Sequence, residues 1–191
     1  MAETRKLLPT VGPLLADHLI RLSPDDRRLR FGGLFMPDDV LRRYAEAIDW
    51  AHAWQVGWFE AGAMRGLVQL SLPRRDSEAK APWMKQGTAE FGVSVEPPWR
   101  RRGVATKLIR HAVAVARNRE VRDLYMVCQP ENEPMRRLAR KVGLGLTYAA
   151  GEVVGHVALA SPDSETAEAE RALEAAAANG RGAVAWPRAA S

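Results

Sequence analysis

The stretch at 93–109, VSVEPPWRRRGVATKLI, constrains the fold more than any other part of the chain. Over residues 89–96 apolar residues alternate with small or polar ones, which predicts a β-strand with Val93 and Val95 on one face. Two prolines interrupt that strand, and after Gly103 the apolar residues recur at helical spacing. The chain therefore passes from a strand into a helix through a short loop, as chains do in α/β proteins.

A helix that begins at Gly103 offers an anion-binding site. The amides of a first helical turn have no internal partners, and the helix dipole places partial positive charge there. Gly103 lets the backbone approach a ligand closely, and the small side chain of Ala105 leaves the first turn of the helix accessible to that ligand. Three consecutive arginines add positive charge at the same place: Arg100, Arg101 and Arg102. A pyrophosphate is the expected ligand, although neither the loop Gly-x-x-x-x-Gly-Lys-Ser/Thr nor the loop Gly-x-Gly-x-x-Gly is present.

Further strands and helices are expected around this loop. In the second half, strands are expected at 89–96, at 121–128 and once or twice within 146–160, with helices at 103–118 and from Asn132 to Gly143. In the first half, helices are expected at 14–22, from Ser23 and at 37–48, before an antiparallel hairpin of strands at 54–58 and 67–72. The polar, proline-containing segment 74–87 is interpreted as a binding loop.

This pattern predicts an α/β (α+β) fold with one domain at 1–160. The composition changes near Ser161, beyond which Asp163 or Ser164 is expected to cap a helix rich in Ala and Glu. Most apolar residues of this helix are alanines, so we expect it to bury little surface. Segment 161–191 is therefore interpreted as a surface helix followed by a tail.

Composition excludes several classes of protein. The chain has 191 residues, of which 47% are hydrophobic and 27% charged, as in ordinary globular domains. Its single cysteine, Cys128, cannot form an internal disulfide, and a reducing cytoplasmic location is expected. No apolar run approaches the roughly 20 residues of a membrane span, so no membrane association is expected. The four histidines are dispersed and none is spaced from Cys128 as metal ligands are, so no metal is expected.

The loop and the helix after Asn132 resemble two signature blocks of the GNAT N-acetyltransferases. Residues 100–105, RRRGVA, fit the family signature Gln/Arg-x-x-Gly-x-Gly/Ala. The second family block is Asn-x-x-Ala-x-x-Leu-Tyr-x-Lys-x-Gly-Phe, and its spacings are followed by Asn132, Met135, Leu138, Lys141, Gly143 and Leu144. The resemblance covers about 52–160, with its core motifs at 89–145. The stretch LSPDDRRLRF at 22–31 also resembles the opening of a bacterial subgroup that includes protein-lysine acetyltransferase domains.

The resemblance implies the GNAT fold, a mixed sheet that is splayed between the strands at 89–96 and 121–128, and acetyl-CoA as cosubstrate. The backbone of the first strand would pair with the pantetheine arm as an added strand does, and the loop amides would hold the pyrophosphate. The cap of the later helix would lie along the pantetheine. The residues implied in cofactor binding are Val93, Ser94, Val95, Arg100, Arg101, Arg102, Gly103, Val104, Ala105, Thr106 and Asn132.

The implied reaction is direct attack of a primary amine, from a small molecule or a protein lysine, on the thioester. It needs a base, a polarised carbonyl and an acid for the leaving thiolate. Glu90 is the candidate base, because many family members carry a glutamate at this strand position and partial burial would raise its pKa. The family's usual acid, a tyrosine, aligns with Ala139, so the acid stays open. The alternatives are Tyr125, Tyr148, Ser94, Cys128 and a water molecule.

Two other functions are compatible with the sequence. The alanine at position 139 also fits a non-catalytic sensor or regulatory module that binds acetyl-CoA or CoA. The net charge of +5 and the arginine run raise the question of nucleic-acid binding. The arginines are concentrated in one turn without interleaved aromatic residues, so no nucleic acid is expected as a partner. Dimers are common in the family, so the resemblance allows a homodimer.

Overall fold

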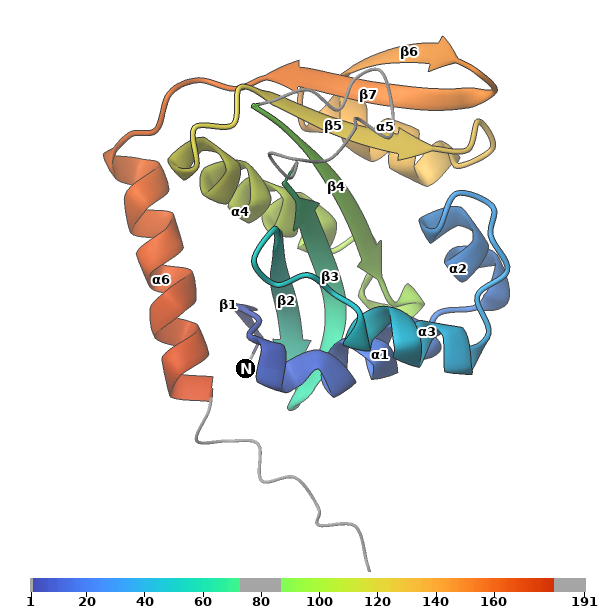
Figure 1. The fold of residues 1–191 in the computed structure, drawn as a ribbon, viewed down its shortest axis with the longest axis horizontal. Coiled ribbons are helices and arrows are strands. Elements are labelled where there is room, and N and C mark those ends of the chain that lie inside the picture. Colours follow the sequence, from blue (N-terminus) through green and yellow to red (C-terminus); the bar gives the residue numbers. More distant parts are fainter. Residues whose placement is uncertain (1, 73–86, 181–191) are drawn as a thin grey trace, which may run out of the picture.

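A computed structural model describes residues 2–72 and 87–180 of the chain (Figure 1). The predicted binding loop at 74–87, apart from Gly87, and the predicted tail after residue 180 lie outside the described residues. The strands are β1 (Glu3–Lys6), β2 (Ala53–Glu60), β3 (Ala63–Ser71), β4 (Thr88–Val95), β5 (Asp123–Cys128), β6 (Gly145–Ala149) and β7 (Glu152–Ala158). The helices are η1 (Pro9–Val11), α1 (Gly12–Ile20), α2 (Pro24–Arg30), α3 (Asp38–Glu46), η2 (Pro97–Trp99), α4 (Val104–Asn118), α5 (Glu133–Lys141) and α6 (Ser164–Gly180).

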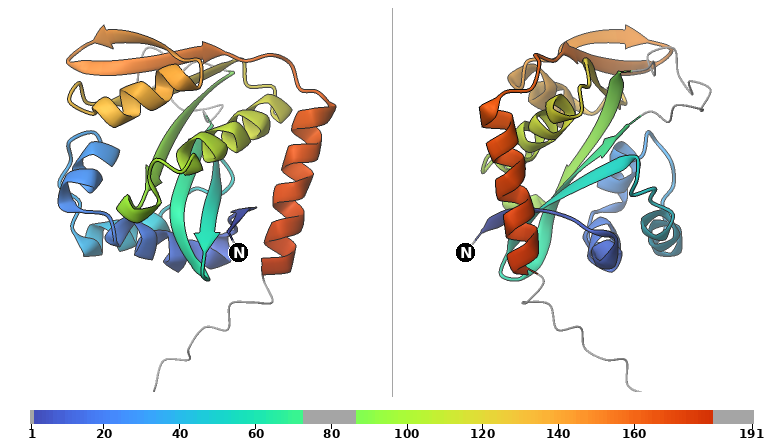
Figure 2. Two further views of the ribbon diagram at one scale, coloured as in Figure 1. Left: turned by 180° about the vertical axis from the view of Figure 1, so that it is seen from behind. Right: turned by 60° about the vertical axis from the view of Figure 1, so that its left-hand side comes forward.

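These strands form one mixed sheet of seven strands in the order β1-β2-β3-β4-β5-β7-β6. The first four pair antiparallel in chain order, β4 pairs parallel with β5, and β5, β7 and β6 pair antiparallel. Helices α4 and α6 lie on one side of the sheet, and α1, α2 and α3 lie on the other (Figure 2). The predicted fold class and the predicted hairpin are confirmed, and the region 146–160 proves to hold two strands.

Each side of the sheet has its own hydrophobic core. On the side of α4, the buried residues include Phe91, Leu108 and Leu124. On the other side, Leu15 of α1 and Leu41 of α3 pack on the sheet and are fully buried. Burial of each such side chain stabilises the folded state by about 1.5–3 kcal/mol relative to leaving it exposed. Both helical layers are therefore held firmly against the sheet.

Strands β4 and β5 run together for only a short distance. Their parallel register covers three residue pairs, from Thr88 opposite Asp123 to Glu90 opposite Tyr125. Beyond Glu90, β4 continues to Val95 beside β3, while β5 continues to its end beside β7. The two strands therefore separate, which confirms the predicted splay of the sheet.

Two features near the chain ends were not predicted correctly. Strand β1 was not expected, because its four residues ETRK show no apolar alternation. Helix α6 was expected to bury little, yet Leu173 and Ala177 are buried as it packs against α4 and β1. Its predicted cap is confirmed, since the backbone amide of Thr166 donates to Asp163 Oδ1 at 2.9 Å.

A buried carboxylate ties α1 to the end of β4. Glu96, which directly follows β4, is 4% exposed. It accepts from Arg21 Nε at 2.8 Å and from Arg65 Nη1 at 3.0 Å, and His18 Nδ1 lies 3.1 Å from Oε1. Burial alone would raise the pKa of the Glu96 carboxyl, but the hydrogen bonds from His18, Arg21 and Arg65 lower it to about 2. The strand end and the loop that follows it are therefore anchored by charge as well as by packing.

The depressed pKa of Glu96 makes stability depend on pH in the acid range. Because the pKa of about 2 in the folded state lies below the ordinary glutamate value of 4.5, the stabilisation is complete above about pH 4.5 and is lost as the pH falls toward 2. We expect Glu96→Gln to lower the free energy of unfolding by about 3 kcal/mol near neutral pH, and by progressively less in acid. Urea unfolding over this pH range measures the difference. Glu46→Gln, at an exposed carboxylate of α3, should change stability by less than about 0.5 kcal/mol, and a pH-independent loss in Glu96→Gln would contradict the assignment.

Candidate functional site

The loop between β4 and α4 has the geometry of an anion cradle. Arg101 and Gly103 both have positive φ, of 61° and 79°, and Gly103 caps α4 without a side chain. A Cβ built on Gly103 would meet no heavy atom within 4 Å, so the space above this helix start is open. Because the amides of the first turn have no intrahelical acceptors, Val104, Ala105 and Thr106 direct N–H groups toward this space. The predicted position of the helix start is confirmed.

The three arginines of the loop have different surroundings. The guanidinium of Arg100 donates to the Val95 carbonyl at 2.8 Å and pairs with Asp26 of α2 at 2.8 Å. Arg101 is exposed, and Arg102 lies 3.9 Å from Glu60. The charge of Arg100 is therefore largely compensated within the protein. The expectation that all three arginines add to the positive potential of the loop is wrong for Arg100. Arg100 instead connects the loop to α2.

Among the described residues, the edge of β4 that faces β5 has no strand partner beyond Glu90. Within the described residues, β5 provides no pairing partner for the stretch from Phe91 to Val95. The predicted contact residues Val93, Ser94 and Val95 all lie in this stretch. Backbone N–H and C=O groups need partners when they are shielded from water, so this edge is suited to an extended ligand that carries amides. The free edge ends next to the loop before α4, which makes one continuous site.

The side chains of β4 divide between the two faces of the sheet. Phe91 and Val95 belong to the core on the side of α4. Glu90, Gly92 and Ser94 alternate with them and face α1 and α2, where Ser94 Oγ lies 2.9 Å from His18 Nε2. Glu90 is half-buried and makes no side-chain hydrogen bond to any described residue. Burial raises the pKa of its carboxyl, Arg30 opposes this and Glu152 adds to it.

Sequence reasoning did not find Arg30, the last residue of α2. A Cβ on Gly92 would stand 2.5 Å from the Arg30 Cζ, so the guanidinium lies directly on the backbone of β4 at this position. Arg30 Nη2 also donates to Gln69 Oε1, and Gln69 is opposite Gly92 in the register of β3 and β4. The signal available in the sequence was the LSPDDRRLRF stretch, whose resemblance did not identify which arginine reaches the sheet.

The second signature block lies on the other side of the splay. Asn132 caps α5 as predicted, with its Oδ1 accepting from the Met135 amide at 3.2 Å. Its side chain is therefore engaged in the helix, and any contact with a cofactor stays a prediction. Ala139, at the position of the family's tyrosine, is fully buried in the core, so α5 presents no hydroxyl there.

The four side chains considered as acids lie in different places. Tyr125 is opposite Glu90 at the last pair of the β4–β5 register and stacks on His156, with ring centroids 4.6 Å apart. Tyr148 is exposed and accepts from Arg136 Nη1 at 2.6 Å. Cys128 is buried at the end of β5, and burial raises the pKa of its thiol. Ser94 faces α1, so Tyr125 is the one beside both Glu90 and the point where the strands separate.

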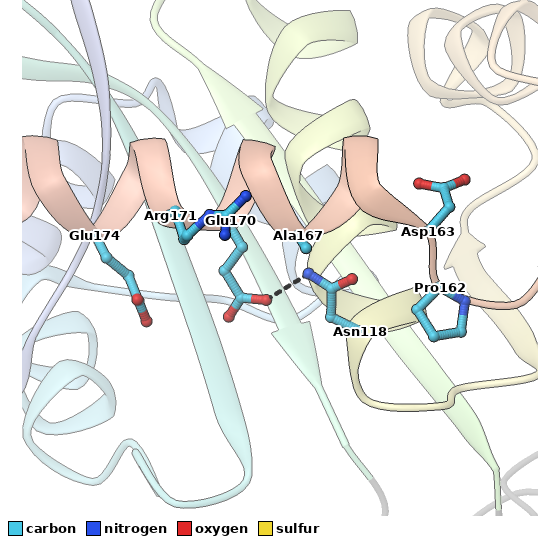
Figure 3. A pocket seen from close by; sticks show the side chains of 7 residues that line it. All are labelled: Asn118, Pro162, Asp163, Ala167, Glu170, Arg171 and Glu174. Atoms are coloured by element: carbon cyan, nitrogen blue, oxygen red, sulfur yellow. Dashed lines mark hydrogen bonds between the residues drawn. The ribbon is translucent and has the colours of Figure 1, made fainter.

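A pocket beside α6 is separate from this site (Figure 3). It is lined by Asn118, Pro162, Asp163, Ala167, Glu170, Arg171 and Glu174. Its polar groups largely bind one another or their neighbours, since Asn118 donates to Glu170 at 2.7 Å and Arg119 pairs with the same carboxylate. No lining residue comes from β4, β5 or the loop, so we assign this pocket to the packing of α6 on α4.

Over residues 2–72 and 87–180, no three His, Cys, Asp or Glu side chains are grouped as metal ligands would be. Among the helices that the structure describes, none is long and apolar enough to cross a membrane.

Comparisons with known proteins identify the family and agree with the fold. Residues 20–144 match the acetyltransferase (GNAT) family. The GNAT domain of S. lividans PAT has 21% identity and a TM-score of 0.68, over 83% of this chain and 90% of that one. The paiA N-acetyltransferase of Thermoplasma acidophilum, solved with coenzyme A, has 12% identity and a TM-score of 0.61, over 83% of this chain and 99% of that one. The yncA protein of Salmonella typhimurium, solved with acetyl-CoA, has 15% identity and a TM-score of 0.62, over 86% of this chain and 99% of that one.

No curated protein sequence matches the chain. The family match nevertheless spans well over half of its length, and it includes the loop, strand β4 and the whole block from Asn132 to Leu144. The chain therefore belongs to the acetyltransferase (GNAT) family.

Proposed function

We propose that this protein transfers an acetyl group from acetyl-CoA to a primary amine in the cytoplasm. The observation that carries the proposal is the free edge of β4, which begins at Glu90 and ends at the open helix start of Gly103. One end of this site offers amides for a pyrophosphate, and the other offers a half-buried carboxylate. A ligand with a diphosphate at one end, a long arm that contains amides and a reactive group at the other end requires protein groups in this order.

The residues present fit acetyl-CoA. The open space over Gly103 leaves room for a phosphate beside the first-turn amides of α4, and Arg101 and Arg102 are at the surface there. The backbone from Val93 to Val95 would hold the pantetheine amides along the free edge. When bound, acetyl-CoA supplies the activated acyl group, as a thioester. The chain's own part is to place that end next to Glu90 and to exclude water from it.

Glu90 is suited to remove the proton from the acceptor amine. It faces α2, has no hydrogen-bonded partner among the described side chains, and burial raises the pKa of its carboxyl toward the working range of a base. The amine nitrogen then forms the new C–N bond as the C–S bond breaks, and the departing thiolate takes up a proton. Tyr125 is the nearest of the candidate donors along the sheet, because it is opposite Glu90 in the register.

Gly103→Glu tests the pyrophosphate site. A side chain at φ 79° strains the backbone, and its carboxylate would occupy the phosphate position and repel the ligand. We expect CoA affinity, measured by calorimetry, to fall by at least about 100-fold. Gly151→Glu is the matched control, because Gly151 also has positive φ, at 82°, and open space around it, but lies in the turn between β6 and β7. Equal affinity losses in the two variants would contradict the assignment.

Glu90→Gln tests the base. We expect kcat in a thiol-release assay to fall by about 100-fold or more, while CoA affinity stays within about twofold. In the unaltered protein the rate should rise with pH as Glu90 loses its proton, and the variant should lack this limb. Glu152→Gln should move this rise in rate to lower pH, because the Glu152 carboxylate raises the pKa of Glu90.

An unchanged pH–rate profile in Glu90→Gln would remove Glu90 from the mechanism. If CoA binds but no amine releases thiol, the non-catalytic module that Ala139 also fits would be favoured over an active transferase.

A further inference from the structure

The guanidinium of Arg30 is built into the face of β4 on the side of α1, α2 and α3. A Cβ at residue 92 would stand 2.5 Å from Cζ, 2.5 Å from Nη1 and 2.6 Å from Nη2 of Arg30, so any other residue at this position would move the guanidinium from its place on the strand. A glycine inside a strand weakens the strand and commonly marks a close approach of another group. Here the approaching group is a positive charge, two residues along the strand from Glu90.

Arg30 is held in place, yet most of its N–H donors have no acceptor among the described residues. Nη2 donates to Gln69 Oε1, and the Tyr44 hydroxyl donates to the same oxygen at 3.1 Å. Gln69 is itself 5% exposed, which makes it a rigid support. Of the residues that the structure describes, Gln69 is the one hydrogen-bond acceptor of Nη1 and Nη2, no carboxylate pairs with the guanidinium, and the buried Nε has no partner. A guanidinium with free, fixed donors matches the geometry of a carboxylate.

The charges around Arg30 suit an acceptor that carries one positive and one negative group. Glu90 faces the same side of β4, and the two are close enough for Arg30 to lower the pKa of the Glu90 carboxyl. An acceptor whose ammonium lies at Glu90 would therefore place its neighbouring atoms beside Arg30. A carboxylate there would be attracted, whereas a second cationic group would be repelled.

We propose that Arg30 binds a carboxylate next to the acceptor amine, so that the preferred acceptors are α-amino acids rather than polyamines or lysine side chains of proteins. This proposal rests on the proposed function, because it assumes that Glu90 marks the position of the reacting amine. It assigns a role to the LSPDDRRLRF stretch: α2 ends at Arg30 and delivers that side chain to the sheet. Arg30 is thus the residue that determines acceptor specificity.

The test compares each of several L-amino acids with its own carboxamide in the thiol-release assay. The two differ in the anionic group and little in shape. The carboxamide has the less basic and therefore more readily deprotonated amine, so a preference for the acid cannot come from amine reactivity. We expect kcat/KM for the preferred acid to exceed that for its amide by at least about tenfold, as expected for hydrogen bonds to a charged group.

Arg30→Gln should bring this ratio to about 1 or below, mainly by reducing turnover of the acid. Loss of the positive charge also changes the pKa of Glu90, but that effect acts on both acceptors and cancels in the ratio. Arg30→Lys should keep part of the preference, since it retains a point charge without the planar fork, and it replaces Arg30→Gln if the latter fails to fold. Arg43→Gln is the control, because Arg43 lies at the exposed surface of α3 and pairs with Asp39.

Binding of the same acids and amides to CoA-saturated protein, measured by calorimetry, separates this proposal from the proposed function. Thiol release that is equally fast with acids, amides and lysine peptides would overturn the role of Arg30 and leave the transferase intact. Carboxylate-dependent binding without thiol release for any amine would support Arg30 and overturn the transferase. A ratio that is unchanged in Arg30→Gln would also overturn the role of Arg30.

Discussion

The separation of β4 from β5 is the constraint on which the rest of the site depends. Each strand stays paired along its outer edge: β4 with β3 as far as Val95, and β5 with β7 as far as Cys128. Because the two outer partners diverge, the inner edges can share only three residue pairs. In the part of the chain that the structure describes, the backbone groups of β4 beyond these pairs have no partner on β5, and this is the edge along which we propose that the CoA arm binds.

The loop that follows β4 stays in place because charges inside the protein hold both of its flanks. Glu96 joins the strand end to α1 through His18 and Arg21, and Arg100 joins the loop to α2 through Asp26. A loop that carries several arginines and left-handed residues would otherwise have many accessible conformations, and ordering them would weaken ligand binding. The conformational entropy of the loop is therefore lost during folding and not on ligand binding. The contacts that order the loop come from α1 and α2, the same helices that face Glu90.

Local signals in the sequence were sufficient for most of the fold but not for the face of the site opposite α4. The helix at 104–118 could be predicted because its apolar residues repeat at helical spacing after a glycine, and the splay followed from the resemblance to a family. Strand β1 could not, since ETRK pairs with β2 through backbone bonds that do not depend on its side chains. The contacts of Arg30 with Gly92 and of Arg100 with Asp26 join residues far apart in the chain, and arginines in a helix or loop usually face solvent.

The two faces and the edge of β4 divide the work of one reaction. Its apolar side chains, such as Phe91, fix the strand on α4, and its edge toward β5 is where we propose that the thioester arm binds. Its third set of positions, Glu90, Gly92 and Ser94, faces the helices α1 and α2. Since the edge offers only backbone groups, it can bind the same cosubstrate whatever the side chains are. On the proposed function, choice of the acceptor falls to that third set and to the helices that reach it, and the guanidinium of Arg30 lies directly against Gly92 there.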